Sequence, residues 1–488
     1  MNYKKFSIAA ILFFFYYLPA FSQAVPGITI GGEKNEVGLS ICASHDGGYV
    51  IAGSTRSYGN GSNNFLFVSV DESGEVKIER NYGWDKQDFF RKVIPVEGGY
   101  VFVGDSYNLG FSGLDIYMLK TDRFGYSEQG FAYGTNKRDN AFDIIKTEDN
   151  GFLILGHSRL ENPKGDILLF KVNQEGEKLW QKSYWDDGND YAFKIIKSSQ
   201  DDGYVFVGSK NGFFDDVHAD FHTHDADIML IKIDPDGNEL WRKTYGKSEH
   251  DFGYSVCNAS DGGYYLLGSS QSYGNGSFDM LLIKTDEEGT RQWIKSFGGA
   301  NYEYGKSIVM NNEGNLYLVG STKSFGTEDT PDVYIVKTDP QGNEIWSETF
   351  GGTAPDYGED VIALPNGGCA IAGSTKSFGE GGSDVYLLRL KANGDVDMFA
   401  GIQNRPYSKA VVFPNPWLGS CIIYVPDTSV TNYTIQLFDS SGRTVSKENF
   451  NGNEFIQKRG NLTSGVYFYK ITSNKNPLIF YKGKLVVK

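Results

Sequence analysis

The residues on which most metal and redox sites depend are scarce in this sequence, which has four Cys and six His among 488 residues. Cys42 and Cys257 occupy the same register in two repeats described below, and Cys369 and Cys421 lie elsewhere. This spacing forms neither a disulfide framework nor a metal-binding motif, so we expect buried free thiols. The chain also lacks a G-x-S-x-G elbow, an H-E-x-x-H pair and a phosphate-binding loop, which leaves thin support for the common catalytic mechanisms.

Long hydrophobic runs are missing too, apart from one stretch at the N-terminus. The apolar run at residues 8–18 follows two lysines and precedes the small-x-small sequence Ala-Phe-Ser at residues 20–22. This order is typical of a signal peptide, and the run is shorter than a membrane-spanning helix. We predict a signal peptide over residues 1–22, cleaved after Ser22, with a membrane anchor as the alternative. Because Cys42 lies too far from the run, a lipid-anchored start is not expected, nor is a transmembrane segment after cleavage.

Positive charge is scarce in the central part of the chain. The formal net charge is −15, but residues 404–488 carry eleven Lys and Arg against four Asp and Glu, a net of +7, and the signal segment adds +2. Subtracting both leaves about −24 on residues 23–403. A surface of that sign repels phosphate backbones, so nucleic acid is not expected as a partner.

Long amphipathic helical stretches are absent, and the sequence instead repeats a short strand. A Gly-rich turn and an apolar strand ending in glycine, as in GGYVIAG and GGYYLLG, recur seven times at spacings of 51, 52, 52, 60, 52 and 53 residues. The seven terminal glycines are Gly53, Gly104, Gly156, Gly208, Gly268, Gly320 and Gly373. Self-similarity at this period predicts a repeat fold, and short strands with tight turns favour a β-propeller.

Each repeat divides into four strands, here called a to d, with tight turns joining a to b and c to d. In the fifth repeat the expected strands span residues 254–257, 264–267, 279–284 and 292–297. The seventh repeat has no strand d after residues 384–390, and GITIGG at residues 27–32 matches the missing one. We therefore predict an all-β fold: a seven-bladed β-propeller over residues 23–403, closed by the N-terminal strand, and then a small β-sandwich (immunoglobulin-like) tail.

Tryptophans recur in strand d. The motif DPDGNELW ending at Trp241 returns, with variation, before Trp180, Trp293 and Trp346. It resembles the tryptophan-docking motif of quinoprotein propellers, and the resemblance implies that each indole packs between adjacent blades. The resemblance is confined to this docking motif. Quinoproteins generally have eight blades and a dedicated cofactor pocket, which these residues do not supply.

After Asn404 the sequence pattern changes. A Pro-Asn-Pro sequence, a D-x-x-G turn, an S-G-x-Y-x-Y strand and a terminal G-K-hydrophobic-hydrophobic-K follow in order. The motif residues at the two ends are Pro414, Asn415, Pro416, Gly483 and Lys484. Residues 404–488 resemble the type A C-terminal sorting domain of the type IX secretion system, and the repeats resemble uncharacterised secreted bacterial propellers that carry this tail. The resemblance implies that secretion machinery exports the protein to the surface or medium of an outer-membrane-bearing bacterium. A small immunoglobulin-like binding module is the alternative.

One end of the predicted propeller carries the longer d–a and b–c loops, and ligands are expected there because function concentrates in variable loops on a rigid scaffold. An acid stands just before strand a in every repeat. These acids are Glu36, Asp88, Asp139, Asp190, Asp251, Glu303 and Asp356. They could ring the channel mouth and attract a cation such as Ca²⁺, or each could tether its own loops by accepting N–H groups.

Two further features lie in these loops. The b–c loops repeat Ser-aromatic-Gly, and the aromatic residues are Tyr58, Tyr273, Phe325 and Phe378. They suit either a carbohydrate surface or packing of a loop on its neighbour. The fourth repeat alone has a long insertion, which holds His218, Asp220, His222, His224 and Asp225. Imidazoles among carboxylates suit Zn²⁺ or another divalent ion, and a solvated polar loop is the alternative.

These observations favour a secreted or cell-surface propeller that acts as a non-catalytic binding module for a polysaccharide or protein. One alternative is a carbohydrate-active enzyme, a lyase or hydrolase, that uses carboxylates of the variable face. Another is a structural surface or adhesion component. No cofactor is established by the sequence, and Ca²⁺ and Zn²⁺ are the candidate ions.

Overall fold

The computed structural model describes residues 26–59, 62–83, 86–107, 113–135, 137–159, 165–184, 188–211, 226–326, 329–399, 411–413, 420–424, 432–452, 454–460, 462–474 and 480–487. Within these residues every regular element is a β-strand. Most of the sheets are four-stranded and antiparallel, and six of them are built from four consecutive strands, as propeller blades are. The prediction of an all-β fold is confirmed.

Seven such sheets lie in the described part of residues 28–390. The first three contain β2 (Glu36–Ala43), β3 (Tyr49–Thr55), β4 (Asn64–Val70) and β5 (Val76–Tyr82); β6 (Asp88–Val96), β7 (Gly99–Ser106), β8 (Asp115–Asp122) and β9 (Ser127–Tyr133); and β10 (Asp139–Lys146), β11 (Phe152–Ser158), β12 (Asp166–Val172) and β13 (Lys178–Tyr184). The fourth and fifth contain β14 (Tyr191–Lys197), β15 (Tyr204–Lys210), β16 (Asp227–Ile233) and β17 (Glu239–Tyr245); and β18 (Asp251–Asn258), β19 (Tyr264–Ser270), β20 (Asp279–Thr285) and β21 (Arg291–Phe297). The sixth and seventh contain β22 (Glu303–Met310), β23 (Leu316–Thr322), β24 (Asp332–Thr338) and β25 (Glu344–Phe350); and β26 (Asp356–Ala363), β27 (Cys369–Thr375), β28 (Asp384–Leu390) and β1 (Ile28–Ile30).

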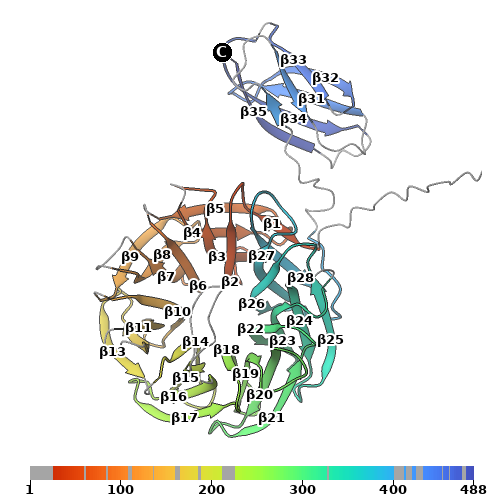
Figure 1. Cartoon of the computed structure of the whole chain (residues 1–488). Helices are drawn as coiled ribbons and strands as arrows, with labels where there is room; N and C mark the ends of the chain where they lie inside the picture. Colours follow the sequence, from red (N-terminus) through yellow and green to blue (C-terminus); the bar gives the residue numbers. More distant parts are fainter. Residues whose placement is uncertain are drawn as a thin grey trace, which may run out of the picture.

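The sheets are arranged around a common centre, with strand a of each sheet innermost (Figure 1). Each of these inner strands contacts the inner strand of the next sheet, and β26 contacts β2. At the same junction β1 pairs antiparallel with β28, with Thr29 opposite Tyr386. The N-terminal strand thus supplies the fourth strand of the last sheet.

Neighbouring sheets are joined through strand d and the c–d turn. In the turn between β20 and β21, Gly289 has a φ of 76°, and a Cβ there would lie 2.8 Å from Trp241 of β17. The Tyr245 hydroxyl, also from β17, donates to the Gly289 carbonyl over 2.6 Å. The inter-sheet position expected for this tryptophan is therefore confirmed, and the turn needs glycine both for its backbone and for the indole.

Strand a is longer than the sequence predicted. In the fifth sheet it begins at Asp251, whereas the expected strand begins at residue 254. The reason is a β-bulge between Gly253 and Ser255, which interrupts the alternation but not the pairing with β19. The other six inner strands have a bulge at the same register.

The C-terminal part has its own core. A three-stranded sheet contains β29 (Val411–Phe413), β30 (Ser420–Tyr424) and β33 (Glu454–Lys458), and a four-stranded sheet contains β32 (Thr444–Asn451), β31 (Asn432–Phe438), β34 (Gly465–Ser473) and β35 (Phe480–Val487). Ile423 and Phe455 of the first sheet pack in one cluster with Ile435 and Tyr469 of the second. Two antiparallel sheets over a shared apolar core are consistent with the predicted tail.

Candidate functional site

The seven repeated acids lie at the start of the inner strands. Six are the first residue of their strand, and Asp190 directly precedes β14, so the expected position just before strand a is off by one residue in six repeats. All seven are fully buried, with 0% exposure for each. Their carboxylates are not presented to solvent around a channel mouth.

The contacts of these acids explain their repetition. Glu36 accepts hydrogen bonds from the Gly32 amide at 2.7 Å, from the Thr55 hydroxyl at 2.8 Å and from the Ser57 hydroxyl at 3.0 Å. Asp356 repeats the pattern with the Ser377 hydroxyl at 2.6 Å. The acids of four repeats therefore tie the preceding d–a loop to the b–c loop of their own sheet, namely Glu36, Asp251, Glu303 and Asp356. The Asp139 carboxylate bonds only Thr135 of its d–a loop among the described residues. This pattern favours the tether alternative.

The serine in these contacts belongs to the Ser-aromatic-Gly loops, and the aromatic residues pack back onto their sheets. Phe378 lies 5.8 Å from the Tyr386 ring, and the half-buried Tyr58 hydroxyl donates to the Gly31 carbonyl. Tyr273 is also half-buried, while Phe325 is 45% exposed. These four side chains are not brought together into one surface patch by any contact among the described residues.

Several predicted residues lie outside the described residues. They are the signal peptide, His218, Asp220, His222, His224, Asp225, Pro414, Asn415 and Pro416. Within the described ranges, no group of three or more His, Cys, Asp or Glu could hold a metal ion.

The described cysteines carry free thiols. Cys42 and Cys369 are buried and Cys257 is half-buried, and none of the three forms a disulfide. Burial raises the pKa of Cys42 and of Cys257 to about 12, so these thiols stay protonated and unreactive. The expectation of free thiols is confirmed for these three.

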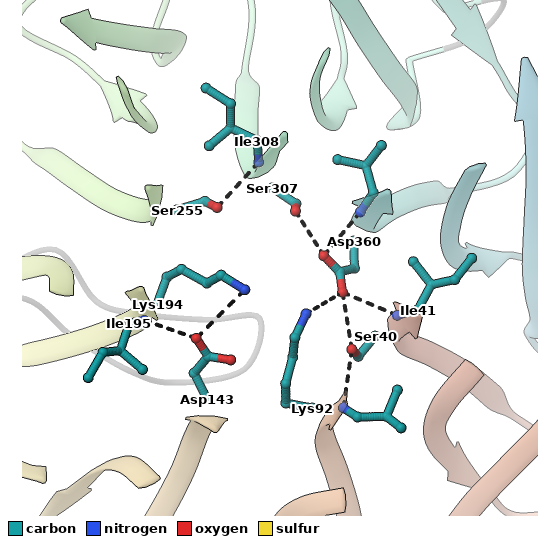
Figure 2. Close-up of polar contacts among 12 residues, drawn as sticks. Ser40, Ile41, Lys92, Asp143, Lys194, Ile195, Ser255, Ser307, Ile308 and Asp360 are labelled. Atoms are coloured by element: carbon teal, nitrogen blue, oxygen red, sulfur yellow. Dashed lines mark hydrogen bonds and ion pairs between the residues drawn. The ribbon is translucent and has the colours of Figure 1, made fainter. Parts of the chain in front are cut away.

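A polar cluster that the sequence reasoning missed lies at the centre of the seven sheets. It consists of the residue that follows the bulge in each inner strand, four positions after the acid. We call these residues the axial ring: Ser40, Lys92, Asp143, Lys194, Ser255, Ser307 and Asp360. Figure 2 shows their side chains converging from different sheets. Unlike the acids, they differ from repeat to repeat.

One side of the axial ring is fully connected. Asp360 pairs with Lys92 at 2.6 Å, and it accepts hydrogen bonds from the hydroxyls of Ser40 at 3.1 Å and Ser307 at 2.9 Å. The Ile41 amide adds a bond of 3.1 Å. Burial alone would raise the pKa of this carboxyl, but Lys92 and the other donors hold it down at about 2. One carboxylate thus joins the sixth and seventh sheets to the first and second.

The other side of the axial ring is less complete. Lys194 and Asp143 form an ion pair of 3.7 Å, longer than a hydrogen bond, and we call these two residues the open pair. The Ile195 amide donates to Asp143 Oδ2 over 2.9 Å. Asp143 is 1% exposed, and its Oδ1 atom has no hydrogen-bond partner among the described residues. In Figure 2 the dashed lines from Lys194 and Ile195 end on one oxygen of Asp143, and none reaches the second oxygen.

Aromatic side chains cluster next to the open pair, on the loop side of it. They come from the starts of β10, β14, β18 and β22 and from the loops that precede β20 and β22. We call them the aromatic arc: Phe142, Tyr191, Phe193, Phe252, Tyr254, Phe278, Tyr302 and Tyr304. Ring contacts run along the arc, with centroid distances of 5.0 Å for Phe142–Phe193, 5.3 Å for Phe193–Tyr254 and 5.5 Å for Phe278–Tyr304.

Part of the aromatic arc is accessible to solvent. Tyr302 is 39% exposed, and Phe193, Tyr254 and Tyr304 are half-buried. The Lys306 ammonium lies 4.8 Å from the Tyr254 ring, which is the geometry of a cation–π contact. Aromatic faces with tyrosine hydroxyls and a lysine beside them offer both an apolar and a polar surface to a ligand.

Comparison with known families identifies the tail. Residues 411–488 match the model of the "Secretion system C-terminal sorting domain", as the sequence motifs predicted. The class of protein follows: an all-β protein exported through the type IX secretion system to the cell surface or the medium.

Matches to individual proteins are partial. The chain is 25% identical over 186 residues to the regulatory protein FlaEY of Caulobacter vibrioides, and 35% identical over 78 residues to an endo-acting ulvan lyase of Formosa agariphila. These matches span 33% and 16% of this chain, but only 19% and 14% of the two relatives. The extracellular domain of the putative hybrid two-component system BT4673 from B. thetaiotaomicron matches 95% of this chain and 58% of that chain, at 11% identity and a TM-score of 0.43.

Among the described residues, no helix has the length and apolarity needed to cross a bilayer.

Proposed function

We propose that residues 23–403 form a seven-bladed β-propeller that β1 closes, and that residues 404–488 form a β-sandwich. Seven four-stranded sheets, the pairing of β1 with β28 and the contact of β26 with β2 support this arrangement. A signal peptide over residues 1–22 would supply the entry to the export route. The tail would engage the secretion machinery.

The propeller binds a polysaccharide at the aromatic arc. The observation that carries this proposal is the continuity of the arc across four neighbouring sheets, beside the axis and on the loop side. Sugar rings present C–H faces flanked by hydroxyls, and tyrosine offers the matching combination of an apolar face and a hydroxyl. Four aromatic residues with exposed or half-buried faces, namely Phe193, Tyr254, Tyr302 and Tyr304, provide more than one stacking position.

A glycan array tests the binding function. The labelled mature chain is applied to neutral and acidic glycans attached through their reducing ends, with Tyr254→Ala and Tyr304→Ala as variants. We expect binding to at least one glycan class and a loss of at least tenfold in each variant. The variant Phe325→Ala serves as a comparison, because it removes the most exposed of the loop aromatics without touching the arc. Retention by no glycan, or equal loss in all three variants, would refute the arc as the site.

A second candidate is a lyase or hydrolase. Glu359 is half-buried at the strand position that Tyr254 occupies in its own repeat, and its charge raises the pKa of Tyr254 and Tyr357 in addition to the larger effect of burial. A carboxylate beside an aromatic arc is a feature that glycan-cleaving enzymes use. Product formation from any polysaccharide, abolished by Glu359→Gln, would replace the binding function with a catalytic one.

A further inference from the structure

The open pair and the aromatic arc are adjacent in sequence and occupy successive positions along the inner strands. Phe142 directly precedes Asp143, Phe193 directly precedes Lys194, and Tyr254 directly precedes Ser255 of the axial ring. Since a strand rises about 3.3 Å per residue, the open pair lies one step further from the loops than these three rings. We refer to the aromatic residues as the walls and to the open pair as the floor of the candidate site.

The floor is built for a ligand that both donates and accepts hydrogen bonds. Asp143 Oδ1 is a buried acceptor without a partner among the described residues, and such a group destabilises the fold if it stays unsatisfied. Lys194 Nζ carries three donor hydrogens, and its ion pair with Asp143 is too long for a hydrogen bond. A ligand that satisfies both groups needs a hydrogen-bond donor for Asp143 Oδ1 and, next to it, an acceptor for Lys194 Nζ.

Charge at the floor selects against ions. Asp143 and Lys194 neutralise each other, and the charge of the neighbouring Lys92 is already balanced by Asp360 at 2.6 Å. An anion would face the bare Asp143 Oδ1 atom, and a cation would face both ammonium groups. Burial lowers the pKa of Lys194, so a further positive charge there is disfavoured. A neutral, polyhydroxylated group fits best.

We propose that the open pair is the floor of the polysaccharide site and holds two neighbouring hydroxyls of one uncharged sugar residue, one donating to Asp143 Oδ1 and the other accepting from Lys194 Nζ. This inference rests on the proposed binding function and narrows it to neutral sugars. The sugar ring would lie against Phe193 and Tyr254, and the rest of the glycan would follow the arc toward Tyr302. Asp143 and Lys194 would then set specificity, while the arc would supply contact area.

Saturation-transfer NMR on the mature full chain tests the assignment. The probes are the methyl glycosides of glucose, galactose and mannose, with methyl glucuronide as the charged comparison. We expect saturation of at least one neutral glycoside, a loss of at least fivefold in Asp143→Asn and in Lys194→Met, and no stronger signal from the glucuronide. Ser307→Ala is the matched control, because it changes the axial ring on the connected side and should leave the signal unchanged.

The outcomes separate the two proposals. Absence of any neutral-glycoside signal, or a signal that both variants keep, overturns the floor assignment; if the glycan array is positive in that case, the binding function stands without it. A negative array overturns both. Thermal unfolding of each variant checks the fold, and if Asp143→Asn does not fold, Lys194→Met alone decides, since it removes a charge but leaves the Ile195–Asp143 bond in place.

Discussion

The Asp360 carboxylate should be among the most sensitive positions for stability. Replacing it by alanine removes the ion pair with Lys92 at 2.6 Å and three further hydrogen bonds from Ser40, Ile41 and Ser307. The ammonium of Lys92 would then be left in the axial ring without its nearest counter-charge. Removal of one partner of a buried pair costs about 3–5 kcal/mol, so we expect Asp360→Ala to lower the free energy of unfolding by that amount.

Urea unfolding of the mature chain, followed by tryptophan fluorescence, measures this effect. Ser307→Ala is the control, because it deletes one neutral donor to the same carboxylate and should cost about 1 kcal/mol. In the double variant Asp360→Leu/Lys92→Met both charges are gone, and we expect most of the lost stability to return. The reasoning fails if Asp360→Ala costs no more than Ser307→Ala, or if the double variant is as unstable as Asp360→Ala.

The same carboxylate gives a pH signature. Its pKa lies at about 2 in the folded chain against an ordinary value of 3.8, so its stabilising effect is complete above about pH 4 and is lost as the pH falls toward 2. A shift of that size corresponds to roughly 2 kcal/mol. Wild type should therefore lose more stability than the double variant Asp360→Leu/Lys92→Met between pH 5 and pH 2.

Three more predictions address other parts of the chain. Burial raises the pKa of Asp384 to about 7. The stability that the protonated group contributes is therefore present below about pH 4 and is lost as the pH rises through 7. The difference in thermal stability between Asp384→Asn and wild type should accordingly shift in favour of the variant between pH 4 and pH 8. Gly289→Ala should destabilise by more than Gly98→Ala, because both glycines have positive φ but only at Gly289 would the Cβ meet Trp241, and equal unfolding midpoints would contradict the packing argument. Deletion of residues 412–488 should leave the protein in the periplasm, as judged by cell fractionation, and normal surface display would refute the sorting role.

The Asp384 prediction has a natural counterpart in the chain. Strand c begins with Asp384 in the last sheet and with Asn64 in the first, and each pairs with a threonine of strand b. Asparagine has the shape of an aspartic acid that keeps its proton. Its presence in the first sheet shows that a neutral side chain is accommodated at this position, where the second to sixth sheets have aspartate as the last sheet does. A lower relative stability of Asp384→Asn at pH 8 would contradict this interpretation.

The repetition of the sequence predicted the four-stranded units, because a glycine at the end of strand b and turn residues at fixed offsets specify local geometry. The strand bounds for β28 were predicted to the residue. Strand a was predicted too short because the bulge before Ser255 shifts the alternation of buried and exposed positions, and a bulge has no residue signature of its own. The position of Trp241 between two sheets was predicted correctly, because a large aromatic side chain that recurs at one register of strand d has to be buried against a neighbouring sheet.

The site was harder to predict. The acids attracted attention because every repeat has one at this position, yet this repetition reflects a buried hydrogen-bond pattern, as at Glu36. The axial ring could have been found by counting four residues from each acid. There the side chain varies between serine, lysine and aspartate, whereas the next residue is always isoleucine or valine. What the sequence could not reveal is which of these varied positions meet, because that depends on the order of the sheets around the axis.

In this repeat protein, positions that are shared by all repeats and positions that vary between repeats have different structural roles. A residue that is the same in every repeat can stabilise only what every repeat has in common, which here is the attachment of loops to strands. Joining the last sheet to the first is a task that occurs once, and Asp360 performs it with partners from three other sheets. Asp143 has the same charge and the same register but one oxygen without a partner in the described part of the chain. Asp143 also joins two sheets, because it accepts the Ile195 amide and pairs with Lys194 of the fourth sheet. Its remaining oxygen is the acceptor that the proposed sugar hydroxyl would use.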